Sequence, residues 1–199
     1  PTVFIGVPRV YARFQERISQ SVESSSFIQR TLFNWAYERQ LRAEQNPTGP
    51  NKVPRSGLWD ALVFKKVRGK LLPNCRLALT GSAPMSAQTN DFLKVCLQCP
   101  VVQGYGLTET VGGMNCSPPG ASTSGTCGGP LPGVYVKLVD VPEMGYLSSD
   151  TPCPRGEICV KGSIVTSGYY KNEAATAEAF DSEGYFLTGD IAHWLPDGS

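Results

Sequence analysis

The stretch from Cys75 to Gln103 constrains the fold more than any other part of the chain. It predicts a strand at CRLALT, a tight turn at GSAP, a helix from Ala87 to Leu97 and a second strand at PVVQ. Such a crossover is almost always right-handed and lays its two strands parallel. The carboxyl ends of both strands, followed by GSAP and GYGLTE, should therefore open on one edge of a sheet, where ligands of open α/β sheets bind.

The segments before this unit predict flanking helices. The apolar run PTVFIGV indicates a buried strand, and the helix after it has core positions at intervals of four residues: Val10, Phe14, Ile18 and Val22. A second helix is predicted from about Phe27 to Gln45, before the loop NPTGPNKVPRSG, and helix resumes near Leu58.

From about residue 125 the pattern changes to short strands separated by turns, VYVKLVD, GEICVKGSIV, GYFLTGD and IAHWLPDG. Ile158 and Val160 alternate with other residues, as in a half-buried strand, and Asn172 is placed to cap a short helix that has Glu173 in its first turn. We therefore expect an α/β fold: residues 1–120 form part of a mostly parallel sheet with flanking helices, and residues 121–199 form a small β-rich subdomain.

Composition excludes several classes of protein. No run approaches the roughly 18 apolar residues of a membrane span, and no secretory leader opens the chain. The seven cysteines cannot all pair with one another, which favours a reducing compartment, and Cys96 and Cys99 lack the further ligands of a zinc site because His193 is the sole histidine. The ends at Pro1 and Ser199 lead us to expect an internal piece of a longer protein.

Charge is unevenly distributed along the chain. Residues 1–80 carry 13 Lys or Arg against 5 acids, and residues 81–199 carry 5 against 12. A basic first part suits anionic lipid headgroups, nucleic acid or the phosphates of a cofactor, although a solvated helical surface is the simpler interpretation. Its aromatic residues recur at helical spacing, which argues against a nucleic-acid stacking platform.

The two glycine turns and a third motif carry residues suited to a nucleotide. Tyr105 lies between two glycines, so its ring can lie flat against a base. Thr108 can donate to a phosphate oxygen, and Glu109 can hold a divalent cation. GSAP offers backbone groups and a flat wall, and Asp190, in LTGD, can accept both hydroxyls of a ribose. Each motif alone is also ordinary turn chemistry.

Together and in this order, the motifs resemble the adenylate-forming enzyme superfamily, and most closely its long-chain fatty acyl-CoA synthetases. The blocks PTVFIGVPRVYARF, SGLWDALVFKKV, LALTGSAPMS, QGYGLTE, VKLVDVPEMGY, GEICVKG, GYYKNEAATAEAF and GYFLTGDIAHWLPDG carry the resemblance. It implies that Thr108 contacts phosphate, Glu109 holds Mg²⁺ and Asp190 binds ribose. It also implies a nucleotide-binding set made of Gly81, Ser82, Ala83, Pro84, Gln103, Gly104, Tyr105 and Gly106.

The resemblance also marks what this chain lacks. TSGTCGGPLPG, residues 123–133, looks like the phosphate loop of the family, but it has no Pro-Lys ending and leads into the VYVKLVD strand. We therefore read it as a lead-in to the β-rich subdomain. The phosphate loop, the hinge and the C-terminal domain with its lysine are expected outside the chain, so the fragment alone should not catalyse.

The reaction that the resemblance implies consumes a long-chain fatty acid, ATP and coenzyme A, with Mg²⁺, on the cytoplasmic side of the endoplasmic reticulum or peroxisome. The basic first part would then contact the membrane peripherally. Small residues around Gly113 leave space for an alkyl tunnel beside Glu109, although a glycine-rich loop without a ligand fits equally well. A ligase that hands the acyl group to a carrier protein, or a non-catalytic nucleotide- or lipid-binding module, stays open as an alternative.

Overall fold

The computed structural model describes residues 1–45, 57–121 and 123–199. The chain forms two compact units, the first made of Pro1–Gly104 and Ser117–Thr126 and the second of Tyr105–Cys116 and Cys127–Ser199. The loop NPTGPNKVPRSG lies almost wholly outside the described residues. The boundary expected near residue 120 stays a prediction.

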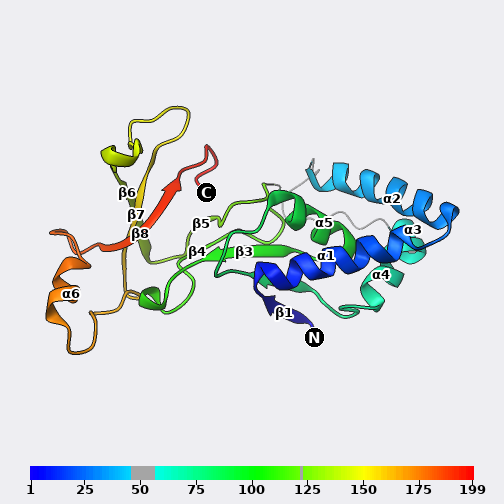
Figure 1. Cartoon of the computed structure of the whole chain (residues 1–199), viewed down its shortest axis with the longest axis horizontal. Helices are drawn as coiled ribbons and strands as arrows, with labels where there is room; N and C mark the ends of the chain where they lie inside the picture. The colour runs from blue at the N-terminus through cyan, green and yellow to red at the C-terminus, as the bar shows by residue number, and fades with distance from the viewer. Residues whose placement is uncertain (46–56, 122) are drawn as a thin grey trace. The chain divides into compact units, whose positions relative to one another are not determined.

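The first unit contains the parallel strands that the sequence predicts. β1 (Val3–Gly6), β2 (Leu77–Thr80) and the β3 strand (Val101–Tyr105) follow one another in the order β1-β2-β3, and all pairings are parallel. The crossover helix α5 (Ala87–Leu97) begins at Ser86, whose side chain accepts a hydrogen bond from the Thr89 amide. The α/β fold class is therefore confirmed (Figure 1).

The expectation of a buried first strand is wrong for one of its faces. Val3 is 46% exposed and Ile5 is 75% exposed. The reason is that the described residues leave this face of the sheet uncovered, since Leu77 and Leu79 of β2, which pair with Val3 and Ile5, are also only half-buried.

Five helical segments accompany these strands in the first unit: α1 (Pro8–Glu23), α2 (Phe27–Gln45), α3 (Gly57–Trp59), η1 (Asp60–Phe64) and α4 (Lys65–Gly69). Ile18 of the predicted stripe is buried, but the most deeply buried side chain of α1 is Tyr11. Its hydroxyl donates to the Phe4 carbonyl at 3.1 Å and to the Leu79 carbonyl at 2.9 Å. Tyr11 therefore ties α1 to β1 and β2.

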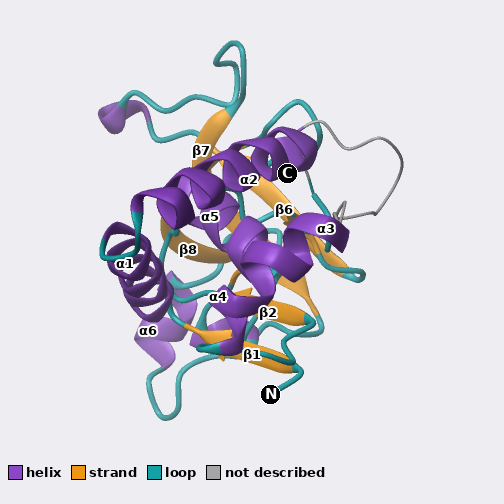
Figure 2. Ribbon diagram, turned by 90° about the vertical axis from the view of Figure 1, so that its right-hand side faces the viewer, coloured by secondary structure: helices purple, strands orange, loops and turns teal. Residues whose placement is uncertain are grey.

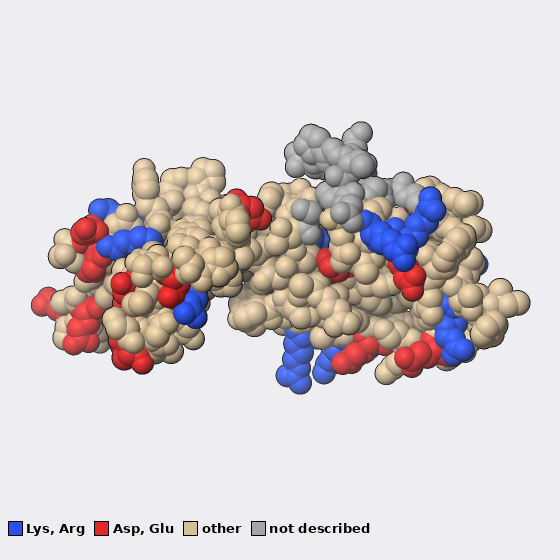
Figure 3. Space-filling model, turned by 90° about the horizontal axis from the view of Figure 1, so that it is seen from above, with Lys and Arg blue, Asp and Glu red and all other residues tan. Residues whose placement is uncertain are grey.

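The core of the first unit lies on both sides of α5. One cluster joins Tyr11, Ala78 and Leu93 near the strands, and a second joins Ile18, Phe33 and Phe64 among the helices. Figure 2 shows α1, α2 and α4 gathered with α5 in this unit. Lys and Arg are frequent over these helices in Figure 3, while Asp and Glu gather over the β-rich unit, as the sequence counts indicate.

The second unit is built mainly of antiparallel strands. β6 (Val134–Val139), β7 (Arg155–Gly162) and β8 (Phe186–His193) form a sheet in the order β6-β7-β8. The predicted strands GYFLTGD and IAHWLPDG share one strand, β8, because the chain turns only after His193. β4 (Asn115–Cys116) pairs with β5 (Gly129–Pro130).

Short helical turns complete this unit, η2 (Thr108–Thr110), η3 (Pro142–Met144) and α6 (Glu173–Glu178). Asn172 caps α6 as predicted, because its side chain accepts from the Ala175 amide at 3.1 Å. Met114, Ile158, Val160 and Phe186 form the core. In neither unit is any described helix both long enough and apolar enough to cross a membrane.

Candidate functional site

In the first unit, the GSAP turn meets the end of the neighbouring parallel strand β3. The turn Gly81–Ser82–Ala83–Pro84 follows β2, and Gly104 lies near the end of β3. A Cβ on Gly81 would lie 3.3 Å from the Gly104 carbonyl oxygen, so the two backbones approach closely. The structure thus brings these two parts of the predicted site together.

The GSAP turn is strained and open to solvent. Ser82 has a φ of 66°, in the left-handed region that residues with a side chain seldom occupy. Ser82, Ala83 and Pro84 are exposed, whereas Met85 is 4% exposed and packs in the core. Met85 therefore anchors a turn whose preceding residues face outward, and strain of this kind gathers at binding sites.

Gln103 is a buried part of the predicted site. Its backbone amide donates to the Ser117 hydroxyl at 2.9 Å, and the Ser117 amide donates to its carbonyl at 2.9 Å. Its side-chain oxygen is buried and has no hydrogen-bond partner among the described residues. An unsatisfied buried acceptor on the strand beside the GSAP turn would suit a polar ligand that carries a donor.

In the second unit, a closed loop presents Thr108 and Glu109. The Leu107 amide donates to the Thr110 hydroxyl at 2.9 Å, and that hydroxyl donates to the Gly112 carbonyl at 2.9 Å. A Cβ on Gly106 would lie only 1.6 Å from the same Gly112 oxygen. The closed loop therefore requires glycine at position 106. This reason differs from the one that the sequence suggests, in which a glycine next to Tyr105 lets a base approach the ring.

Glu109 has a partner that sequence reasoning missed. Its Oε1 accepts a hydrogen bond from the Tyr169 hydroxyl at 3.0 Å, and its backbone carbonyl accepts from the Thr166 amide at 2.7 Å. The bond to the Glu109 carboxylate raises the pKa of Tyr169. Tyr169 lies within the GYYKNEAATAEAF block that carries the resemblance, but nothing in that block indicates a contact with Glu109.

A metal ion at Glu109 would need ligands beyond the protein carboxylate. Among the described residues no group of three or more His, Cys, Asp and Glu side chains comes together as a metal site. Mg²⁺ commonly binds one or two carboxylates together with substrate phosphates and water. A single carboxylate on an outward loop fits Mg²⁺ that arrives with a nucleotide.

Asp190 lies on a bulged part of β8. The register between β7 and β8 shifts between Glu157 and Cys159, and Gly189 has a φ of 73°. The Gly189 amide donates to Glu157 Oε1 at 2.9 Å, and the Asp190 amide donates to the Thr188 hydroxyl at 3.1 Å. Bulges of this kind redirect side chains near functional sites, and here the bulge leaves Asp190 exposed.

The second unit also joins Tyr105 to Asp190. The Tyr105 hydroxyl donates to Asp190 Oδ2 at 2.6 Å. Burial of the ring, and then the bond to Asp190, raises the pKa of Tyr105. Two predicted site residues that are distant in sequence therefore meet. Thr108 is exposed, and the Val111 amide donates to its backbone carbonyl at 3.1 Å. The ligand roles of all these residues stay predictions.

Comparison with known proteins gives matches over most or all of the chain. A family described as AMP-binding enzyme matches residues 1–170. Long chain acyl-CoA synthetase 7, peroxisomal, from Arabidopsis thaliana is 45% identical over the entire chain, which covers 28% of that protein. Fatty acyl-CoA synthetase A from Dictyostelium discoideum is 40% identical, and the chain covers 29% of it.

Among solved structures, the chain is similar to the A domain of a carboxylic acid reductase from Segniliparus rugosus in complex with AMP and a co-purified carboxylic acid. The TM-score is 0.62 at 29% identity, over 100% of this chain and 26% of that one. The chain thus spans less than a third of the proteins to which it is similar.

Proposed function

The chain belongs to the AMP-binding enzyme family, and on that premise we propose that it serves the ATP-dependent activation of long-chain fatty acids to acyl-CoA. The observation that carries the proposal is the meeting of Tyr105 with Asp190 in the unit that also presents Glu109. Identity of 45% to a long-chain acyl-CoA synthetase over the full chain supports the substrate class.

The proposed first step joins the fatty acid to AMP. A carboxylate oxygen of the fatty acid attacks the α-phosphorus of ATP, the bond to the β-phosphate oxygen breaks, and pyrophosphate leaves. A carboxylate is a poor acylating agent because its oxide is a poor leaving group, whereas AMP leaves readily from the mixed anhydride. In the second step the thiol of coenzyme A attacks the acyl carbon, loses its proton and displaces AMP.

The residues of this chain would bind and orient the nucleotide in that scheme. Tyr105 and the GSAP turn would hold adenine, and the buried Gln103 oxygen would accept from a donor on the ligand. Asp190 Oδ1 would accept from a ribose hydroxyl, since Tyr105 occupies Oδ2. Thr108 would donate to a phosphate oxygen. Alignment and fixed dipoles of this kind supply much of the catalysis of phosphate chemistry.

Glu109 would hold Mg²⁺, which neutralises charge on the phosphate oxygens when it is bound. The hydroxyl of Tyr169 keeps Oε1 of that carboxylate oriented by its bond of 3.0 Å. Tyr169 is therefore proposed as a positioning residue that acts through Glu109.

The proposed setting is the cytoplasmic face of an intracellular membrane, endoplasmic reticulum or peroxisome, with peripheral contact through the basic residues of the first unit. The support is the charge of residues 1–80, with 13 Lys or Arg against 5 acids, and the peroxisomal description of the Arabidopsis thaliana relative. Carrier-protein transfer is the alternative to coenzyme A, and thioester assays with each acceptor separate the two.

The test is pyrophosphate release by the complete protein with fatty acids of graded chain length. Glu109→Ala should abolish most of the Mg²⁺-dependent turnover, while Glu143→Ala, which removes an exposed acid from the same unit, should leave it unchanged. Pyrophosphate release that is the same with and without fatty acid would contradict the proposal. A Glu109→Ala protein as active as the wild type would also contradict it.

A further inference from the structure

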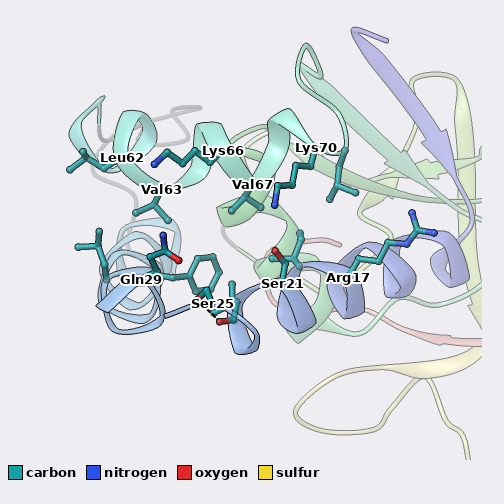
Figure 4. Close-up of a pocket in the computed structure, with 14 residues that line it drawn as sticks. Arg17, Ser21, Ser25, Gln29, Leu62, Val63, Lys66, Val67 and Lys70 are labelled. Atoms are coloured by element: carbon teal, nitrogen blue, oxygen red, sulfur yellow. Dashed lines mark hydrogen bonds between the residues drawn. The ribbon is translucent and has the colours of Figure 1, made fainter. Parts of the chain in front are cut away.

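A cavity of about 730 Å³ lies within the helical unit, apart from every residue of the predicted nucleotide site. It opens between α1, the start of α2, and the segment formed by η1 and α4 (Figure 4). A cavity of this size is in the range that holds small organic ligands. Its lining combines an apolar floor with a rim that carries positive charge.

The floor is made by residues of the helical core. Ile18, Phe33 and Val63 are buried, at 4%, 8% and 8% exposure, and Val22 and Val67 are half-buried around them. Such a surface favours an alkyl chain over a polar ligand, because burying apolar area is the dominant gain when an apolar group leaves water.

The two walls differ in polarity. Lys66 and Lys70 lie along the α4 wall, and the Lys70 side chain points across the cavity toward Ser21 of α1 (Figure 4). Ser25 and Gln29 continue the opposite wall. Several hydrogen-bond donors thus surround the apolar floor.

The charge of the rim is uncompensated in the described part of the chain. Arg17, Lys66 and Lys70 line the cavity, and no Asp or Glu does. None of their three charged side chains forms an ion pair with another described residue. Arg68, on the same helix but outside the cavity, is instead held by both oxygens of Asp60.

We propose that this cavity binds one single-chain anionic amphiphile, with its alkyl chain on the apolar floor and its carboxylate or phosphate head at Lys70, which points across the cavity, while Lys66 and Arg17 add positive charge toward the two ends of the rim. Charge complementarity supports this occupant, because three cationic side chains and no acidic one line the cavity, and an alkyl chain would cover the apolar floor. The inference goes beyond the proposed catalysis, since it shares no residue with the nucleotide site.

The experiment uses the complete protein and probes below their micelle concentrations. Isothermal titration compares dodecyl phosphate, dodecanoate and dodecyltrimethylammonium. Comparison of dodecyl phosphate with dodecanoate distinguishes a phosphate head from the carboxylate head of a fatty acid. Dodecyl phosphate has no carboxylate, so it cannot be a substrate of the proposed adenylation. Binding of either anionic probe, with the cationic probe at least about tenfold weaker, is the expected result.

Two variants locate that binding. Lys66→Glu/Lys70→Glu should weaken the anionic probes by about tenfold or more, while Lys65→Glu, on the same helix outside the cavity, should change affinity by less than about twofold. Ser21→Trp should block the cavity without removing a core side chain, because Ser21 is exposed; Gln20→Trp is its control.

Photocrosslinking with a diazirine-bearing dodecyl phosphate then identifies the contact peptides. Labels should fall on α1, α2, η1 or α4, and Ser21→Trp should remove them. The proposal is overturned if neither anionic probe binds, or if the cationic probe binds equally well. It is also overturned if the labels fall only on other segments, or if the rest of the complete protein covers the cavity and keeps the probe out.

Discussion

Replacing Gly106 with Ala tests whether the closed loop that presents Glu109 depends on a missing side chain. The added Cβ would lie 1.6 Å from the Gly112 oxygen and 2.8 Å from Gly113 Cα, whereas real Cβ contacts essentially never fall below 3.0 Å. The Gly112 carbonyl must therefore move by at least about 1.4 Å, the difference between 3.0 and 1.6 Å.

That movement breaks the hydrogen bond from the Thr110 hydroxyl to the Gly112 carbonyl and strains the bond from the Gly112 amide to Leu107. Thr110 is 1% exposed, so water does not replace the lost bond, and its hydroxyl keeps only the longer bond to the Leu107 carbonyl at 3.1 Å. Loss of one hydrogen bond and weakening of a second each cost about 1 kcal/mol. We expect the free energy of opening this loop to fall by about 2 kcal/mol.

Amide hydrogen exchange in the complete protein measures this quantity directly. The amides of Thr110, Val111 and Gly112 are bonded within the loop and the Met114 amide is bonded to Tyr105. These four amides should exchange about 30-fold faster in Gly106→Ala. Gly113→Ala is the matched control, because its Cβ would meet no atom within 4 Å. Equal exchange in wild type and Gly106→Ala, or an equal effect of Gly113→Ala, would refute the reasoning.

Four other predictions follow from the same contacts. Tyr169→Phe frees one oxygen of Glu109, so the Mg²⁺ concentration for half-maximal turnover should rise about 2- to 10-fold, while an unchanged titration would exclude a positioning role. Tyr105→Phe should weaken AMP affinity by a similar factor in equilibrium dialysis, and equal affinity would contradict it. Burial raises the pKa of Glu44, so the stability contributed by its protonated form is lost as pH rises through that raised pKa. The melting temperature of Glu44→Gln should therefore exceed that of the wild type by a margin that grows from acid to neutral pH, and a constant difference in melting temperature would refute this. Gly113→Trp should shorten the preferred fatty acid chain, and an unchanged chain-length profile would argue against a tunnel there.

Much of the fold could be predicted because local patterns and tertiary packing agree. The crossover from β2 through α5 to β3 follows from apolar periodicity, an N-cap serine and the handedness of such units. The exposed face of β1 could not be predicted, since an apolar run has the same pattern whether one face or both faces of the sheet are covered. The role of Tyr11 could not be predicted either, because its hydrogen-bond partners, Phe4 and Leu79, lie on two different strands.

The candidate site divides in the same way. Residue types suited to a nucleotide could be recognised along the chain, but contacts that join separate segments could not. The hydroxyl of Tyr169 reaches Glu109 across 60 positions, and no spacing rule encodes that pair. The left-handed backbone conformation of Ser82 could not be predicted either, because a serine in a GSAP turn is compatible with ordinary backbone angles.

The bond between Tyr105 and Asp190 joins two roles that the sequence assigns separately. A phenol that donates to Oδ2 leaves Asp190 Oδ1 for a ribose hydroxyl, so the two interactions are compatible on one carboxylate. The same bond restricts rotation of the Tyr105 side chain before any base arrives. A ring that is already ordered loses less conformational entropy when a base stacks on it. Asp190 would therefore increase nucleotide affinity twice, once by contact with the sugar and once by holding the ring that contacts the base.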